Sequence, residues 1–107
     1  GLAVGRPSGF VGGVMKTMLS GELTIQDGKL YDYMRDLLET EAIFLEPSAC
    51  AAFQGPVKLN KSEELKRYVK ENGLSDKMDQ ASHIVWATGG SLVPEKIREE
   101  YKNTYLV

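Results

Sequence analysis

The chain has 107 residues, of which 42% are hydrophobic and 26% are charged. This balance is typical of one globular domain and argues against a disordered chain. A formal net charge of −2 gives none of the basic surface that nucleic acids require, and no apolar stretch approaches the roughly 20 residues of a membrane-spanning helix. The single cysteine, Cys50, excludes an internal disulfide and favours a reducing compartment such as the cytoplasm.

The first segments alternate between helical and extended patterns. Ser8 is placed to cap a helix that stops at Gly21. The apolar side chains of that helix share one face, which we expect to enter the core: Val11, Val14, Met15, Met18 and Leu19. Alternating residues predict a short strand over 22–26, Asp27-Gly28 predicts a turn, and an apolar stripe predicts a helix over 30–41.

A second group of segments follows the same alternation. Residues 43–45 form a short apolar run that predicts a buried strand. Pro47 suits the first turn of a helix, and the small residues after it continue that helix up to Gly55-Pro56.

The last segments complete the pattern. Ser62 is placed to cap a helix over 63–72, and a short helix or turn follows over 74–81. Residues 83–87 predict a strand, and Pro94 starts the last helix. Because strands alternate with helices, we predict an α/β fold with three layers, in which a mainly parallel sheet is flanked by helices.

Residues 84–90 and the proline that follows carry the clearest candidate site. An apolar run ends at Thr88 and two glycines, and the carboxyl ends of strands are where open α/β sheets bind ligands. The Thr88 hydroxyl is a neutral donor and acceptor, and glycine lets the backbone approach a flat group closely. Taken alone, the same residues fit a threonine that ends a strand and an ordinary Gly-Gly turn.

Three motifs together point to one family. They are GLAVGRPSGFVG at residues 1–12, LEPSA at 45–49 and VWATGGSLVP at 85–94. In this order and spacing they resemble the C-terminal part of bacterial D-serine dehydratases, which are fold-type-II enzymes (tryptophan synthase β-like) that use pyridoxal phosphate. The EPSA and TGG elements also resemble those of threonine deaminases and serine racemases.

The resemblance implies that residues 1–107 are a C-terminal fragment of the catalytic domain that binds pyridoxal phosphate. In this family the cofactor lysine and the glycine-rich phosphate loop lie upstream of the matched region, so we expect no catalytic residue in this chain and no activity from it alone. The chain opens at Gly1 without signal-peptide character, which fits a natural N-terminus further upstream. The expected partners are the substrate D-serine and the remainder of the same polypeptide, and the isolated fragment should self-associate through its uncovered apolar face or be only marginally stable.

The resemblance also assigns candidate site residues. It places Thr88 against the pyridine nitrogen, where a neutral hydroxyl leaves that nitrogen largely unprotonated and favours β-elimination of D-serine to pyruvate and ammonia. Gly89 would lie close to the ring, and the loop that holds Val4 and Gly5 would run beside the cofactor. Glu46, where a strand meets a helix, is placed to orient cofactor groups. Members of this family often bind a cation, but its carboxylate ligands would lie upstream, so we assign no metal ligand here.

Two other interpretations stay open. The chain fits a threonine or L-serine dehydratase relative, and it also fits a small α/β binding domain without catalysis. The opening loop, residues 5–9, favours the D-serine enzymes over the first alternative. We expect Ser48 to cap its own helix, Arg6 to make surface or interdomain contacts, and His83 and Cys50 to be surface or packing residues.

Overall fold

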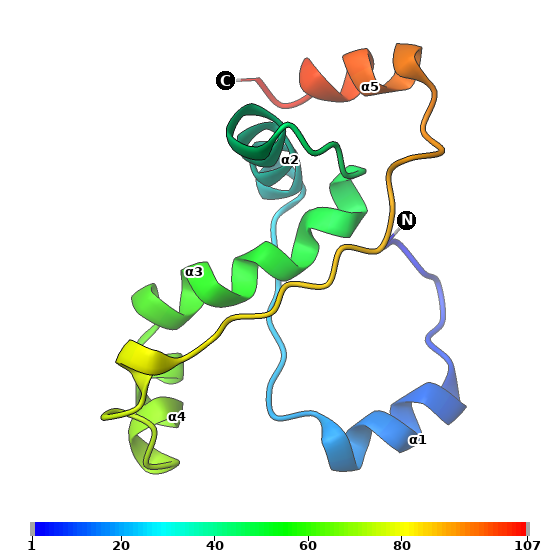
Figure 1. Ribbon diagram of the computed structural model, residues 1–107. Helices are drawn as coiled ribbons and strands as arrows, with labels where there is room; N and C mark the ends of the chain where they lie inside the picture. Colours follow the sequence, from blue (N-terminus) through cyan, green and yellow to red (C-terminus); the bar gives the residue numbers. More distant parts are fainter. Residues whose placement is uncertain (1, 107) are drawn as a thin grey trace.

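The computed structural model describes residues 2–106, and within that range it contains helices and connecting segments but no strand (Figure 1). The elements in chain order are α1 (Gly9–Met18), α2 (Asp27–Glu41), the 3-10 helix η1 (Pro47–Phe53), α3 (Gln54–Lys61), α4 (Glu63–Glu71), the 3-10 turn η2 (Met78–Gln80) and α5 (Glu95–Lys102). The predicted three-layer α/β fold with a mainly parallel sheet is therefore wrong.

The three predicted strands are segments without strand partners. Within residues 2–106, no backbone hydrogen bond joins residues 22–26, 43–45 and 83–87 to one another. A strand exists only through its ladder of hydrogen bonds to a neighbour. An alternating or continuous apolar pattern indicates which residues favour extended backbone. It does not indicate whether a second strand lies beside them. The last of these segments runs instead beside α3 (Figure 1). Residues 82–84 share a hollow there with Pro56 and Leu59.

Helix α1 forms where the sequence predicts it. The Ser8 side chain accepts a hydrogen bond from the backbone amide of Val11 at 3.4 Å, which satisfies one of the free amides of the first turn. The helix ends at Met18, and the chain continues in extended conformation at Leu19. The prediction that its apolar face enters the core is wrong, because no residue of α1 is buried and Phe10 is 82% exposed.

Helix α2 begins earlier than predicted. Asp27 and Gly28 are its first turn rather than a separate turn, and the Asp27 carboxylate there complements the positive end of the helix dipole. The helix ends at Glu41, after which Ala42 takes a left-handed conformation with φ of 56°. The predicted apolar stripe is confirmed, because Leu30 and Met34 are buried.

The predicted end of the middle helix at Gly55-Pro56 is also wrong. The chain passes from η1 directly into α3, and Pro56 lies in the first turn of α3. The amides of a first turn have no partner within the helix, so the missing N–H of proline costs no hydrogen bond there. The starts of the later helices are confirmed within one or two residues, since α4 follows Ser62 and α5 starts directly after Pro94. The predicted cap by Ser62 is wrong, because its side chain makes no capping hydrogen bond and its hydroxyl donates to the Glu64 carboxylate instead.

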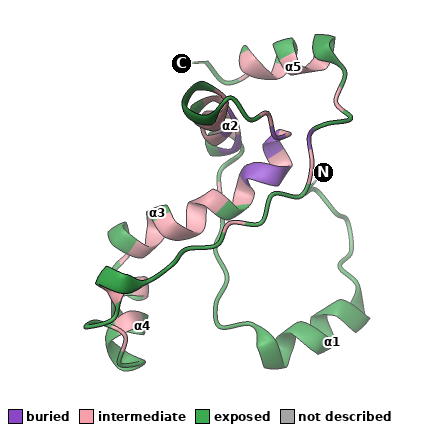
Figure 2. Ribbon diagram, viewed as in Figure 1, coloured by how far each residue is buried: buried purple, intermediate pink, exposed green. Residues whose placement is uncertain are grey.

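The core is small and lies where α2, η1 and the segment before η1 meet. Its buried hydrophobic residues are Leu30, Met34, Leu45, Ala49 and Cys50. Figure 2 shows this burial at the junction of α2 and η1, while α1 is exposed along its whole length. The radius of gyration is 16.1 Å, against about 13 Å for a compact domain of this size. The chain is therefore more open than a self-contained domain.

Candidate functional site

The loop that carries Thr88 lies against the segment that leads into η1. The backbone amide of Glu46 donates to the carbonyl oxygen of Gly89 at 3.1 Å. Gly90 has a φ of 152°, and a Cβ atom there would lie 2.8 Å from both the Glu46 nitrogen and the Leu45 Cα. Glycine at position 90 is thus required by the close approach of two segments of this chain. The structure brings Thr88, Gly89 and Glu46 together, as the prediction of a shared site supposes.

These three residues line a surface hollow of about 540 Å³. Its other walls are residues 90–94 together with Ile97 and Tyr101 of α5. Thr88 is exposed, and its hydroxyl forms no hydrogen bond to any other part of residues 2–106. The hydroxyl is therefore available to a ligand, next to the Glu46 carboxylate and a glycine backbone.

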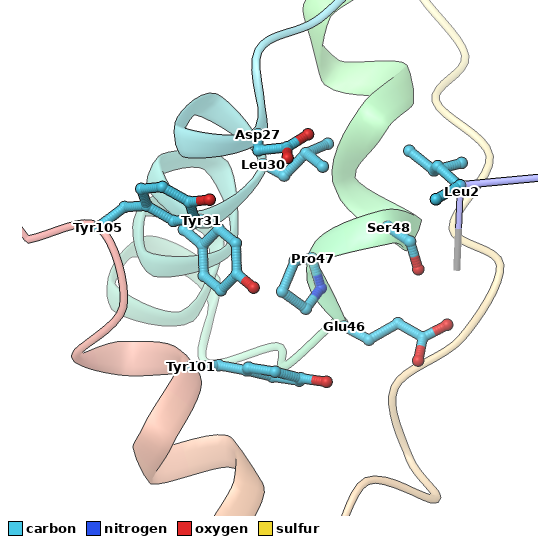
Figure 3. A pocket seen from close by; sticks show the side chains of 10 residues that line it. Leu2, Asp27, Leu30, Tyr31, Glu46, Pro47, Ser48, Tyr101 and Tyr105 are labelled. Atoms are coloured by element: carbon cyan, nitrogen blue, oxygen red, sulfur yellow. The ribbon is translucent and has the colours of Figure 1, made fainter.

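A second hollow of about 240 Å³ opens on the other side of Glu46 (Figure 3). In Figure 3 the Glu46 carboxylate and the Ser48 hydroxyl lie on one side of Pro47, Tyr31 and Tyr105 lie on the other, and the Tyr101 ring lies below it. Glu46 and Tyr101 line both hollows. Because Tyr101 is itself one of the tyrosines, Glu46 is the residue that lies between the Thr88 loop and the tyrosine rings.

The tyrosines of this second hollow pack α2 against the C-terminal segment. The ring of Tyr31 lies 5.9 Å from that of Tyr101, edge to face, and 5.1 Å from that of Tyr105. Desolvation between these rings raises the pKa of Tyr31 above its ordinary value, and the charges of the two neighbouring phenols and Asp27 act in the same direction. Tyr31 is consequently a neutral packing residue at physiological pH.

The N-terminal loop reaches this region with different residues from those predicted. Leu2 and Ala3 line the tyrosine hollow. Val4 is 69% exposed, and an added Cβ atom at Gly5 would meet nothing within 4 Å. The structure therefore places neither Val4 nor Gly5 at either hollow, and Gly1, which opens the predicted loop, lies outside the described residues.

Ser48 and Cys50 both lie in η1, and neither has the surroundings of a reactive group. The predicted cap by Ser48 is wrong, because Glu46 is the residue that precedes η1 and no side chain caps this helix. Cys50 is fully buried, its thiol lies 3.6 Å from the Glu46 carbonyl oxygen to which it donates, and burial raises the pKa of the thiol to about 11. The prediction that Cys50 is a small packing residue is confirmed.

The sequence interpretation did not assign Arg98 to the site. Arg98 of α5 reaches back to the Thr88 loop, where its Nε atom donates to the Val93 carbonyl oxygen at 2.8 Å. Helical side chains point toward the N-terminus of their helix. An arginine four residues after Pro94 is therefore placed to reach the loop that precedes the helix, and this signal was available in the sequence.

Residues 2–106 offer neither a metal-binding cluster nor a membrane-spanning helix. No group of three or more histidine, cysteine, aspartate or glutamate side chains is arranged to hold a metal ion. None of the helices in this range has the length and apolar character needed to cross a membrane.

No protein-family model matches the chain. Three curated relatives that it resembles are each named as a probable D-serine dehydratase. The protein from Fusobacterium nucleatum is 52% identical over 106 residues, which is 99% of this chain and 24% of the relative. Those from Bacillus anthracis and Bacillus cereus are 51% identical over 104 residues and 50% over 101, covering 97% and 94% of this chain.

The chain thus spans about a quarter of the length of the curated relatives that it matches, and the match lies in their C-terminal portion. The resemblance to D-serine dehydratases that the three sequence motifs predict is confirmed. The threonine dehydratase relative and the independent binding domain are not favoured by these names.

Proposed function

We propose that this chain is the C-terminal part of a D-serine dehydratase that depends on pyridoxal phosphate and converts D-serine to pyruvate and ammonia. The observation that carries the proposal is the identity of about half the residues over nearly the whole chain. In this proposal residues 1–107 contribute one wall of the cofactor site, and the rest of the polypeptide contributes the lysine. The fragment alone is expected to be inactive.

The residues of the Thr88 hollow fit a flat ring with polar substituents. The Thr88 hydroxyl has no partner within the described chain, and Gly89 has no side chain to obstruct a ring. The Glu46 carboxylate lies beside it, since an added Cβ atom at Gly89 would be 3.5 Å from Glu46 Oε1. A donor, an open backbone surface and a carboxylate are the groups that would hold an aromatic nitrogen heterocycle.

The role of Thr88 follows from its lack of charge. Pyridoxal phosphate, when bound, withdraws electrons from the substrate Cα and makes its proton acidic. A hydroxyl hydrogen-bonds to the pyridine nitrogen without adding a negative charge that would keep this nitrogen protonated. Thr88 would therefore hold the ring in the electronic state that favours elimination. Glu46 would orient polar groups at the ring edge, and Val4 and Gly5 stay predicted contacts of the N-terminal loop.

The exposed apolar surface supports a covering by the remainder of the polypeptide. The chain exposes 8580 Å², about 2,700 Å² more than the roughly 5,900 Å² of a folded monomer of 11.8 kDa. A standard interface buries only about 800 Å² on each partner. Ile84 and Trp86 are 89% and 77% exposed, and all of α1 is uncovered. The relatives are about four times longer than this chain. We infer that the full protein has residues that correspond to their additional length, and that those residues cover these surfaces.

One residue supports a proposal for the cellular location. Cys50 is a free, buried thiol, which suits a reducing compartment. We therefore propose that the enzyme works in the cytoplasm.

The test is substrate preference in the full-length protein supplied with pyridoxal phosphate. Release of pyruvate from D-serine is expected to be much faster than release of 2-oxobutyrate from L-threonine. Thr88→Ser should keep most of the activity because it keeps the hydroxyl, while Thr88→Asp should lower kcat by about 100- to 1,000-fold, the range expected when a preorganised electrostatic contact is lost. The visible absorbance of the bound cofactor reports whether the Thr88 variants still bind it.

Two outcomes would contradict the proposal. Faster turnover of L-threonine would favour the threonine dehydratase relative. No cofactor absorbance and no pyruvate from any serine would favour a binding domain without catalysis.

A further inference from the structure

Arg98 holds the loop that follows Thr88 through three carbonyl oxygens. Its Nε atom donates to Val93 at 2.8 Å, and one terminal nitrogen lies 3.1 Å from the carbonyl oxygen of Ser91 and 3.5 Å from that of Gly90. A guanidinium group is planar and its donors form a rigid fork. A single side-chain conformation therefore fixes the direction of the loop.

The same guanidinium group also contacts the segment that leads into η1. Its central carbon lies 4.6 Å from the centre of the Phe44 ring, which is the geometry of a cation–π contact. Phe44 comes two residues before Glu46, whose amide donates to the Gly89 carbonyl oxygen. Arg98 thus bridges the two segments that bring Glu46 and Thr88 together.

Few other interactions hold this loop. Within the described chain, the backbone hydrogen bonds of residues 88–93 are those between the Glu46 amide and Gly89 and between the Val93 amide and Gly90. Arg98 is half-buried and has no carboxylate partner among residues 2–106. Its charge is met by the carbonyl dipoles of the loop and by the Phe44 ring. The loop carbonyls are therefore the main polar partners of this side chain.

We propose that Arg98 is a positioning residue that fixes the Thr88 loop against Glu46 and so sets the direction of the Thr88 hydroxyl. The inference rests on the proposed function for the role of Thr88. The Arg98 contacts themselves, and their effect on the loop, are independent of it. Arg98 acts through the loop and touches neither cofactor nor substrate in this proposal.

The experiment uses the full-length protein with three substitutions. Arg98→Met removes the charge and the donors at similar length, and Arg98→Lys keeps the charge without the planar fork. Lys96→Met is the matched control, because Lys96 is exposed on the same helix and makes no hydrogen bond or ion pair within residues 2–106. Hydrogen exchange of the Glu46 and Val93 amides reports on the loop, and titration of the apoenzyme gives the dissociation constant of pyridoxal phosphate.

Arg98→Met should speed exchange at both amides and raise the dissociation constant about tenfold, the loss expected when charge-assisted hydrogen bonds are removed. We expect kcat to fall more than KM for D-serine changes, because the substrate contacts are untouched. Arg98→Lys should be intermediate, and Lys96→Met should match the wild type.

Unchanged exchange and affinity in Arg98→Met would overturn the proposal, and so would an equal effect of Lys96→Met. A lower melting temperature without a change in affinity would reduce Arg98 to a structural residue and would also overturn it. Where Arg98→Met does not fold, Arg98→Lys decides by the same two readouts. If the wild type binds no cofactor, the proposed function fails, and faster amide exchange still identifies Arg98 as the residue that holds the loop.

Discussion

Helices α1 and α2 both carry apolar residues at helical spacing, yet only α2 buries them. In α2 the side chain of Met34 is fully buried against η1, and Tyr33 donates a hydrogen bond to Gln54 at the start of α3. In α1 no residue is buried, and Figure 1 shows this helix apart from the group formed by α2, η1 and α5. The apolar pattern shows which face is suited to burial, and burial requires a partner within reach.

The difference extends to what stabilises each helix. An isolated helix of ten residues is marginal in water, because nucleation is costly and most helix stability comes from packing. Helix α2 has fifteen residues and tertiary contacts, including the donation from Arg35 to the Thr104 carbonyl oxygen at 2.8 Å. Helix α1 has its Ser8 cap and its own backbone bonds. We therefore regard α1 as the part of the structure most dependent on the remainder of the polypeptide.

The largest effect is expected at Gly90. Gly90→Ala would place a Cβ atom 2.8 Å from backbone atoms of Leu45 and Glu46 at a φ of 152°. The overlap should cost about 1–3 kcal/mol, and the backbone strain about 1–3 kcal/mol more. Urea unfolding of the 107-residue chain measures the loss.

Two glycine controls sharpen that test. Gly89→Ala meets only the flexible carboxylate of Glu46 at 3.5 Å and should change little. Gly13→Ala in α1 meets nothing within 4 Å and should stabilise the helix by about 0.5–1 kcal/mol, because alanine favours helix over glycine. If Gly90→Ala were as mild as Gly89→Ala, the close approach of the two segments would be wrong.

A pair of methionines compares the two helices directly. Met34→Ala should destabilise the chain by about 2–5 kcal/mol, because it leaves a cavity in the core. Met18 is 71% exposed, so Met18→Ala should change the unfolding free energy of the 107-residue chain by less than about 0.5 kcal/mol. In the full-length protein Met18→Ala should cost more, if the remainder of the polypeptide covers α1. Equal costs in the short chain would show that α1 is packed like α2.

Local signals predicted most helices, and non-local contacts explain the errors. Ser8 and Pro94 mark helix starts through hydrogen bonding and fixed φ, which neighbouring residues alone determine. The predicted strands over 22–26, 43–45 and 83–87 depend on partners that these sequence patterns do not supply. Val4 and Gly5 line neither hollow of the described chain, and they stay predicted contacts of the cofactor, since nothing local fixes where that loop lies.

At the candidate site, the predicted grouping of residues is correct but its predicted structural basis is wrong. Thr88, Gly89 and Glu46 were predicted as neighbours because both segments were expected to end strands at one sheet edge. They are neighbours through a loop contact instead, with the Gly89 carbonyl oxygen accepting from the Glu46 amide. The prediction that these residues lie close together is therefore correct, although the predicted architecture is wrong. Arg98 was missed because its partners are backbone carbonyls, which no residue type in the loop reveals. The only available signal was its own position in the first turns of the helix that follows Pro94.

The smallest effect concerns Cys50 in the buried region. Burial raises the pKa of this thiol from 9.0 to about 11, which lowers its thiolate fraction at pH 8 by about 100-fold. The folded state holds the proton more tightly than the unfolded state, so the thiol's contribution to stability is complete below about pH 9 and is lost as the pH rises through about 11.

Alkylation by iodoacetamide at pH 8, mapped by mass spectrometry, should therefore be slow in the native protein and fast in urea. A control at an exposed position is Ser20→Cys beside α1, which should react at the unfolded rate in the short chain. Because Cys50 and Leu45 belong to the same buried cluster, equally fast labelling of the native Cys50 would mean that η1 opens as freely as α1 and that the two regions do not differ in stability.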